Sequence, residues 1–398
     1  MKKQLFKVSL LFTLLVFAVS CQEEEVAEKK VLVSSSLFLT RSASELQTFI
    51  SVAGIDLPLS ELVNDVEIYK VTYTTPYKGE DITASGLVIL PKTNSPVGIL
   101  SFQHGTIAAH NQAPTALALN SGELILYAAL ASPGFIAVIP DFIGFGASAE
   151  LMHPYYVEDL TASAILDNIR AGKELAAQKG VRFNEKLFLA GYSQGGYATM
   201  ATHKAIEENG FPGYNLIASF PAAGGYDIKG VQEYFFSLET YDEPFFLPYV
   251  AYAYQTAFDW TQPLTNFFNE PYASQIPALF DGTKSGSAIN QQLTTSILGL
   301  VNNDLLENID TDPKYSYIVD AFNENSLVDF TPTIPVFMYH GSADVTVPYQ
   351  NSVTSYARYI QNGASTNTVQ FFTIEGATHY TGFFPYAEDF VPRLLDLR

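Results

Sequence analysis

In the middle of the chain, a serine with a glycine two residues to each side lies between an apolar run and a stretch with the periodicity of a helix. Residues 191–195 read Gly-Tyr-Ser-Gln-Gly; they follow the apolar run 187–190, which predicts a buried strand, and lead into 194–209, which predicts a helix. On so tight a strand-to-helix turn, the Ser193 hydroxyl projects beyond the sheet edge, and the flanking glycines leave room for neighbouring backbone. The helix points its positive end at that hydroxyl. The motif predicts a nucleophile, with a glycine-rich turn that has no chemistry as the alternative.

On both sides of this unit, apolar runs that predict strands alternate with stretches that predict helices. Continuous apolar runs separated by helices indicate a mostly parallel sheet covered on both faces, which is an α/β fold. Alternating residues at 66–74 and 82–90 predict an antiparallel hairpin at one edge. The other predicted strands are 97–102, 135–139, 187–190, 216–220, 335–339 and 369–374, and the predicted helices are short ones within 42–63, then 120–131, 157–179, 194–209, 349–361 and 387–397.

One long segment, residues 226–333, breaks this rhythm. It is rich in Phe, Tyr, Leu and Asn and poor in strand patterns. We expect a mainly helical cap, inserted before the last two strands and lying over the carboxyl edge of the sheet, where ligands bind in open α/β folds. The cap has aromatic pairs such as Phe245-Phe246 and Phe267-Phe268. These pairs fit either the core of the cap itself or an apolar pocket beneath a lid.

Composition excludes several classes of protein. Of 398 residues, 47% are hydrophobic and 16% charged, which is enough apolar material for a large core and argues against disorder. The net charge of -20 disfavours nucleic acid as a partner. Cys21 is the only cysteine, so neither an intrachain disulfide nor a cysteine zinc site can form. The six histidines show no metal-ligand spacing, and we expect neither a metal nor a cofactor.

The N-terminus has the pattern of a targeting segment. Three lysines within residues 1–7 precede the apolar run 8–19, which is short for a membrane span and typical of a signal peptide. Small residues before Cys21 resemble the lipobox of bacterial lipoproteins. That resemblance implies a signal peptide at 1–20, lipid attachment at Cys21 and an outer-membrane lipoprotein of the bacterial cell envelope, facing either the periplasm or the cell surface. Residues 21–30 are then an acidic tether and 31–398 the folded domain; a plain secretory signal or an uncleaved anchor are the alternatives.

Three local motifs together resemble the α/β-hydrolase superfamily. They are the turn at 191–195, the Gln-His-Gly-Thr sequence at 103–106, and the Pro-Asp-Phe-Ile-Gly-Phe-Gly-Ala-Ser sequence at 140–148, which with His153-Pro154-Tyr155 is similar to secretory lipases. The resemblance covers nearly all of 31–398 by order of elements. It implies the α/β-hydrolase fold and an oxyanion hole made by backbone N–H groups. The sequence at 103–106 departs from the HGGG form of many esterases.

The resemblance and the chemistry of serine catalysis together select a set of site residues. A serine needs an adjacent base that is itself held by an acid, in the chain order serine, acid, histidine. His379 follows the last predicted strand, in the loop where the family has its base. Asp344 lies in an H-G-x-x-D-x-x-V-P pattern that resembles the family's acid loop; capping of the next helix is its alternative role. The predicted set is completed by the oxyanion donors Gln194 and Thr106 and the turn glycines Gly191 and Gly195.

The remaining histidines are expected to have structural roles. His203 falls within the helix after Ser193, too far along to reach the nucleophile. His104 and His340 each precede a glycine at a strand end and are expected to bond loop backbone. His153 suits either packing or the lining of a pocket.

These residues predict a serine esterase or lipase that acts through an acyl-enzyme intermediate. The expected partners are small-molecule, lipid or acylated-glycan esters, and a membrane through the lipid at Cys21. Two alternatives remain open: a serine peptidase of the same fold and a non-catalytic surface binding module. The sequence predicts no oligomeric state.

Overall fold

The computed structural model of the protein describes residues 29–398. The predicted signal peptide, Cys21 and the tether as far as residue 28 lie outside the described residues. Within 29–398, no helix is both long enough and apolar enough to cross a membrane.

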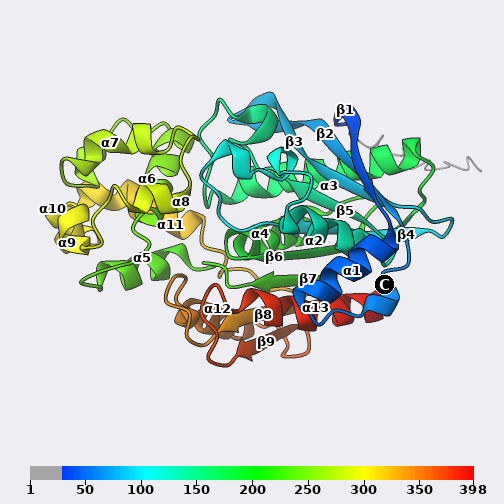
Figure 1. The fold of residues 1–398 in the computed structure, drawn as a ribbon. Coiled ribbons are helices and arrows are strands. Elements are labelled where there is room, and N and C mark those ends of the chain that lie inside the picture. The colour runs from blue at the N-terminus through cyan, green and yellow to red at the C-terminus, as the bar shows by residue number, and fades with distance from the viewer. Residues whose placement is uncertain (1–28) are drawn as a thin grey trace, which may run out of the picture.

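A single twisted sheet of nine strands forms the centre of the molecule (Figure 1). The strand order is β1-β2-β3-β5-β4-β6-β7-β8-β9. The six strands from β5 to β9 in this order run parallel, and β1, β2 and β3 pair antiparallel at one edge. The strands are β1 (Leu32–Arg41), β2 (Val66–Tyr77), β3 (Glu80–Pro91), β4 (Val97–Gln103), β5 (Phe135–Pro140), β6 (Phe183–Tyr192), β7 (Asn215–Ala222), β8 (Val336–Gly341) and β9 (Val369–Ile374).

The first strand is an addition to the predicted order. β1 pairs with β2 from Arg41 opposite Val66 to Leu32 opposite Tyr73. It forms the edge of the sheet, and most of its side chains are exposed or half-buried, so it lacks the apolar run that identified the other strands. The hairpin that follows, β2 and β3, is confirmed along its whole length.

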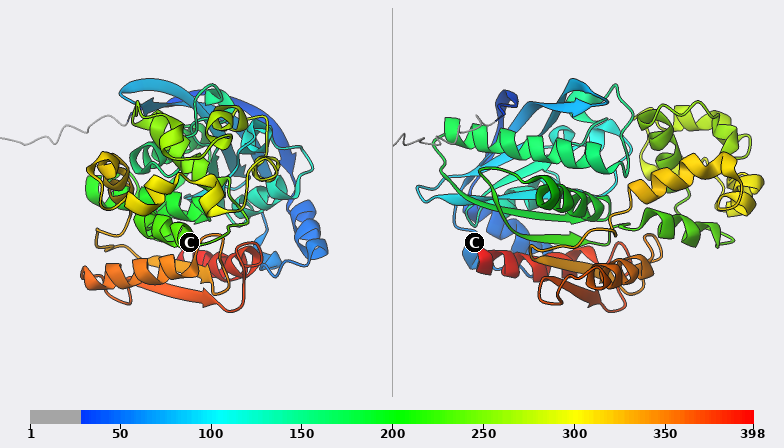
Figure 2. Two further views of the ribbon diagram at one scale, coloured as in Figure 1. Left: turned by 90° about the vertical axis from the view of Figure 1, so that its left-hand side faces the viewer. Right: turned by 180° about the vertical axis from the view of Figure 1, so that it is seen from behind.

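Helices cover both faces of the sheet, as predicted (Figures 1 and 2). Helices α1, α2 and α13 pack on one face, around a core that includes Ile50, Leu124 and Phe390. Helix α3 packs on the other face through Ile165 and Ile169, beside α4 and α12. Their bounds are α1 (Ala43–Ala53), α2 (Gly122–Ala131), α3 (Glu158–Gln178), α4 (Gln194–Asn209), α12 (Tyr349–Gln361) and α13 (Phe383–Leu397), with short 3-10 turns η1 (Leu59–Glu61), η2 (His110–Gln112), η3 (Pro114–Ala116) and η4 (Gly146–Ser148).

The segment between β7 and β8 forms a helical cap at one end of the sheet (Figures 1 and 2). This confirms the predicted insertion before the last two strands. The cap has a core of its own, in which Phe235, Phe267, Phe268 and Ile276 are buried. Its elements are α5 (Ile228–Phe236), α6 (Phe246–Ala257), η5 (Leu264–Asn266), α7 (Tyr272–Leu279), α8 (Gly286–Asn290), α9 (Ile297–Leu300), α10 (Asn303–Asn308), η6 (Pro313–Tyr315) and α11 (Ser316–Glu324).

Candidate active site

Ser193 occupies the tight turn between β6 and α4. Its backbone has φ 60° and ψ −123°, a conformation that costs a non-glycine residue free energy and that is found where a serine is held for chemistry. A Cβ on Gly191 would collide with the Gly195 carbonyl group, and one on Gly195 would collide with the Gln103 carbonyl oxygen. Gly196, which the sequence argument omitted, is held equally close to Ala222 of β7. Three glycines therefore allow the strained turn to pack against β4 and β7.

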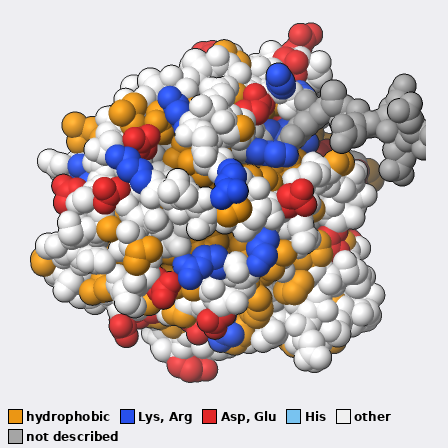
Figure 3. Space-filling view, turned by 90° about the vertical axis from the view of Figure 1, so that its right-hand side faces the viewer, with side chains coloured by type: hydrophobic (Ala, Val, Ile, Leu, Met, Phe, Trp, Pro, Cys, Tyr) orange, Lys and Arg blue, Asp and Glu red, His pale blue; other side chains and the backbone are white. Residues whose placement is uncertain are grey.

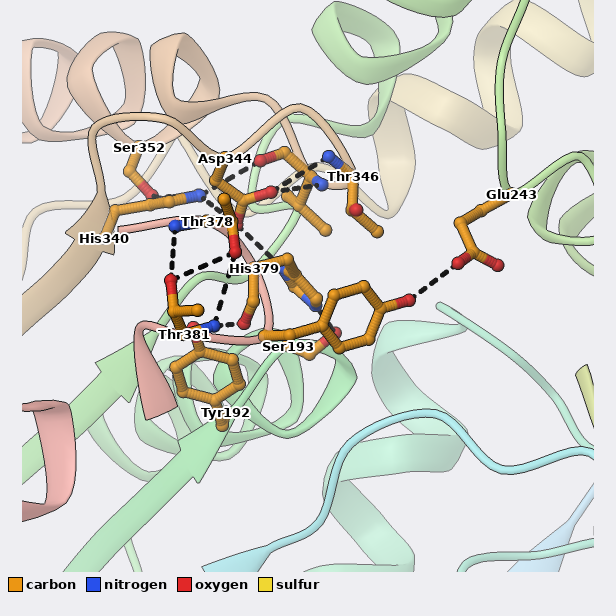
Figure 4. Close-up of polar contacts among 12 residues, drawn as sticks. Tyr192, Ser193, Glu243, His340, Asp344, Thr346, Ser352, Thr378, His379 and Thr381 are labelled. Atoms are coloured by element: carbon orange, nitrogen blue, oxygen red, sulfur yellow. Dashed lines mark hydrogen bonds and ion pairs between the residues drawn. The ribbon is translucent and has the colours of Figure 1, made fainter. Parts of the chain in front are cut away.

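His379 and Asp344 lie in line with this serine (Figure 4). His379 Nε2 is 2.8 Å from Ser193 Oγ, and His379 Nδ1 is 2.6 Å from Asp344 Oδ2. Because a carboxylate can only accept, Nδ1 donates to Asp344, which leaves Nε2 free to accept the serine proton. All three residues are buried. The three predicted residues, which come from the ends of β6, β8 and β9, therefore meet at one edge of the sheet.

Asp344 accepts four hydrogen bonds. Its Oδ1 accepts from the backbone N–H groups of Thr346, at 2.9 Å, and Val347, at 3.0 Å. Its Oδ2 accepts from His379 and also from His340 Nε2, at 3.0 Å. Burial alone would raise the pKa of Asp344, but the bonds and charges of His340 and His379 outweigh it and lower the pKa to about 2. The carboxylate is therefore charged across the neutral range.

His340 contacts the candidate acid, a contact that the sequence argument missed. It was expected to bond loop backbone, and it does approach the Val347 carbonyl oxygen at 3.0 Å. The same Nε2 also donates to Asp344, and Nδ1 lies 2.6 Å from Ser352 Oγ of α12. His340 lies in β8 and Asp344 in the loop that follows, and no sequence signal showed that this loop turns back toward the strand.

Two backbone N–H groups are candidates for an oxyanion hole. Gln194 is the first residue of α4, so its N–H belongs to the first turn, whose donors have no partner within the helix. Thr106 lies in the loop after β4 and, with Gly105, lines the same cavity as Ser193. The Thr106 hydroxyl is 2.8 Å from the Tyr155 hydroxyl, which holds the loop against the core.

His153 contacts the side chain of Gln194, one of the two candidate oxyanion donors. Its Nδ1 donates to the Ile143 carbonyl oxygen at 2.7 Å, so its Nε2 accepts from the Gln194 side-chain amide at 2.6 Å. Burial lowers the pKa of His153 to about 3, which keeps the ring neutral and able to accept. The turn at 140–148 is closed by the buried Asp141, whose carboxylate accepts from Ser85 and Thr115. His153 therefore packs inside the protein and fixes the Gln194 side chain.

Tyr192, the residue between Gly191 and Ser193, holds the histidine loop. Its hydroxyl donates to the His379 carbonyl oxygen at 2.8 Å. The neighbouring Tyr380 reaches the cap, where its hydroxyl donates to Glu243 at 2.7 Å. His203, which was expected to have a structural role, is fully buried in α4 and bonded to Ser219 and Glu207. No group of three or more potential metal-ligating side chains occurs within 29–398.

The mostly parallel nine-stranded sheet, the helices on both of its faces and the cap before its last two strands define the class: the chain has the α/β-hydrolase fold. Known lipases and esterases are among the proteins to which this chain is similar. The Secretory lipase family model matches residues 110–226. Lipase 5 of Candida albicans is 26% identical over 300 residues, which is 70% of this chain and 60% of that lipase. The chain thus spans less than two thirds of that relative.

Solved structures are similar over almost the entire chain. A Legionella pneumophila protein described as a hydrolase is 27% identical with a TM-score of 0.82, and the match covers 92% of this chain and 98% of that one. The rice cell wall degrading esterase LipA of Xanthomonas oryzae, in a ligand-bound form, is 23% identical with a TM-score of 0.78 and coverages of 92% and 97%. Candida antarctica lipase A in its closed state is 18% identical with a TM-score of 0.66 and coverages of 92% and 82%. The likeness to the last two structures, which are 23% and 18% identical, is a likeness of fold.

Proposed function

We propose that this protein is a serine esterase or lipase in which Ser193 is the nucleophile, His379 the base and Asp344 the acid. The observation that carries the proposal is the unbroken series of hydrogen bonds from Asp344 through His379 to the Ser193 hydroxyl. The strained backbone of Ser193 at the start of a helix supports it independently.

The mechanism follows from these positions. His379 takes the proton of Ser193 as the hydroxyl oxygen attacks an ester carbonyl carbon, and Asp344 stabilises the charged imidazolium. The N–H groups of Gln194 and Thr106 donate to the oxyanion, each contributing roughly 2.7–4 kcal/mol to the transition state. His379 then gives its proton to the leaving alcohol. An acyl-enzyme remains on Ser193, and water activated by His379 releases the acid.

The location is proposed from the sequence. The lipobox resemblance at Cys21 supports a lipoprotein of the bacterial cell envelope, held by its N-terminus and acting on esters of lipids, glycans or small molecules.

The decisive test is hydrolysis of nitrophenyl esters by a chain that begins after Cys21, measured beside Ser193→Ala. We expect wild type to hydrolyse esters and Ser193→Ala to lose roughly a millionfold in kcat, because the members of a triad act as one unit. Ser163→Ala, a serine-to-alanine change in α3 away from the turn, should keep full activity. A fluorophosphonate should label wild type and fail to label Ser193→Ala.

Three results would contradict the proposal, and each is distinct. Ester hydrolysis that survives in Ser193→Ala would show that another residue is the nucleophile. Hydrolysis of anilides at a higher kcat/KM than the matching esters would indicate a peptidase. A folded wild type that neither cleaves esters nor reacts with the fluorophosphonate would favour a binding module.

A further inference from the structure

A large cavity leads away from the candidate active site into the body of the molecule. Its volume is about 700 Å³, within the range of about 300–1,000 Å³ that is usual for ligand pockets. Ser193 and His379 line one part of it, and Pro133, Leu394 and Leu395 line the part farthest from them along the sheet. It passes over Phe102 of β4 and Phe135 of β5, so the sheet forms its floor. The cavity therefore extends from the carboxyl edge of the sheet toward the opposite edge.

Helix α13 forms one wall along its whole length. The residues of α13 that line the cavity recur every three to four positions, which places them on one face of the helix. With 15 residues, α13 is about 22 Å long at 1.5 Å per residue, so the cavity can hold an extended chain. The lining residues are Phe383, Phe384, Ala387, Phe390, Val391, Leu394 and Leu395.

The opposite walls are also mainly apolar. Leu126 and Leu130 of α2 face the cavity, and Ile55 and Leu57 come from the segment after α1. The lining carboxylate of Glu123 accepts from the Tyr127 hydroxyl at 2.5 Å, so these two polar groups satisfy each other. A long hydrocarbon chain is the ligand that such a surface recognises, because each methylene it buries is removed from water.

The far end of the cavity is bridged by one side chain. The Arg398 guanidinium donates to the Pro133 carbonyl oxygen at 2.7 Å and pairs with Glu61 at 3.1 Å. Pro133 and Glu61 both line the cavity. The Asp56 N–H also donates to Glu388 of α13 at 3.2 Å, which ties the segment after α1 to the same helix. The end away from Ser193 is therefore held together by side-chain bonds.

The cap side of the same cavity has polar groups beside the aromatic pair Phe245 and Phe246. Glu243, Ser285 and Ser287 line it there, close to Tyr380. An alcohol must depart while the acyl group is still bonded to Ser193, so it needs the cap side, where polar groups can solvate its hydroxyl.

From this geometry we infer that the cavity along α13 holds the acyl chain of a long-chain ester, with a polar alcohol group on the cap side. The inference rests on the proposed function, because the acyl group is placed by its bond to Ser193. It names the substrate class as esters of long fatty acids.

The first experiment measures kcat/KM for nitrophenyl esters from butyrate to palmitate, beside acetates of alkanols of matching length. We expect kcat/KM to rise roughly fourfold for each added methylene of the acyl chain until the cavity is filled. Lengthening the alcohol should have little effect. A preference for acetate or butyrate over longer acids, or a dependence on the alcohol chain in place of the acyl chain, would overturn the inference and leave the esterase proposal standing.

A pair of variants then locates the chain. Ala387→Phe adds a ring one turn beyond Phe383, and Val391→Phe adds one a further turn along, about 6 Å deeper. Relative to butyrate, kcat/KM should fall on medium and long acids in Ala387→Phe and only on the longest acids in Val391→Phe. Asp396→Phe, an exposed change on the same helix, should keep the wild-type profile.

Ala387→Phe is expected to have a shorter limit on acyl-chain length than Val391→Phe. A general loss of folding would not produce this order. Unchanged profiles in both variants, each with wild-type melting temperature, would place the acyl chain elsewhere. Should either variant misfold, Leu126→Phe on the opposite wall replaces it, with an expected limit on acyl-chain length of its own. Absence of hydrolysis of any ester by wild type would remove the proposed function and this inference with it.

Discussion

At the scale of single residues, the buried charge of Asp344 controls the geometry of the site. Four donors surround its two oxygens, and two of these donors are histidine rings. A buried carboxylate that loses a partner retains its desolvation cost, so each donor matters more than an exposed bond would. His340 contributes such a bond without contacting Ser193, which makes it a positioning residue.

Replacing His340 tests this role. His340→Ala should lower kcat about 10- to 100-fold with little change in KM, because a hydrogen bond to a charged group contributes about 1.5–3 kcal/mol. His340→Gln, which retains an N–H donor, should recover part of the loss. Ser352→Ala removes only the bond on the other ring nitrogen and should lose less. Steady-state kinetics measures all three, and equal kcat in wild type and His340→Ala would refute the role.

The acid and base positions could be proposed from the sequence because each follows a recognisable strand and matches a known loop pattern. The contact between His340 and Asp344 could not, because a linear sequence does not say which side chains of a buried loop face each other. Gly196 was missed for a related reason. A side chain there would collide with β7, and only the folded sheet brings β7 next to this position.

At the scale of elements, one carboxylate joins α4 to the start of β8, where the chain returns from the cap. Glu207 accepts from the backbone N–H groups of Thr333 and Ile334, at 2.8 and 2.7 Å, and from His203 at 2.8 Å. Burial would raise the pKa of Glu207, but these bonds outweigh it and lower the pKa to about 2. The contact fixes β8, and with it the loop that carries Asp344.

Removal of this carboxylate should weaken the fold. We expect Glu207→Ala to lower the free energy of unfolding by about 2–4 kcal/mol, since it leaves several donors without an acceptor. Glu207→Gln should have a smaller effect, and the change Glu208→Ala at the exposed neighbouring position should have almost none. Urea unfolding measures the differences; equal midpoints for Glu207→Ala and Glu208→Ala would contradict the assigned contact.

Most elements could be predicted because the spacing of apolar residues identifies them directly. For example, α4, α12 and β9 have the predicted bounds. Two differences have clear causes. β1 lies at an exposed edge, where no apolar run is required. α13 begins at Phe383, four residues before the predicted start, because Pro385 is tolerated in the first turn of a helix. The short helices of the cap depend on their mutual packing and left no separate signals.

At the scale of the whole molecule, His153 makes the fold sensitive to acid. The pKa of His153 is about 3 in the folded protein and 6.5 for an unperturbed histidine, so the unfolded chain binds a proton first. This group therefore lowers stability as the pH falls below 6.5 and stops doing so below about 3. Glu207, lowered from 4.5, and Asp344, lowered from 3.8, add stability above those values and lose it as the pH falls toward 2.

His153→Gln should make stability less dependent on pH. Between pH 6.5 and 4, one histidine of this kind removes about 1.4 kcal/mol per pH unit from the free energy of unfolding. The variant is expected to be less stable than wild type at pH 7, yet its stability should fall more gently on acidification. Urea unfolding at a series of pH values gives both slopes, and parallel curves would refute the role of His153.

The place where the described chain begins has a consequence for orientation. The Val31 N–H donates to Glu174 of α3, which lies 16 residues, or about 24 Å, along that helix from Glu158, where Asn325 of the cap segment is bonded. The chain thus enters at the end of the molecule opposite the cap, on a face where basic and acidic side chains are interspersed (Figure 3). Under the lipid attachment proposed at Cys21, this face is the one nearer the membrane, and the end of the sheet with Ser193 is the one farther from it. The protein would then take its substrates from the side away from its own membrane.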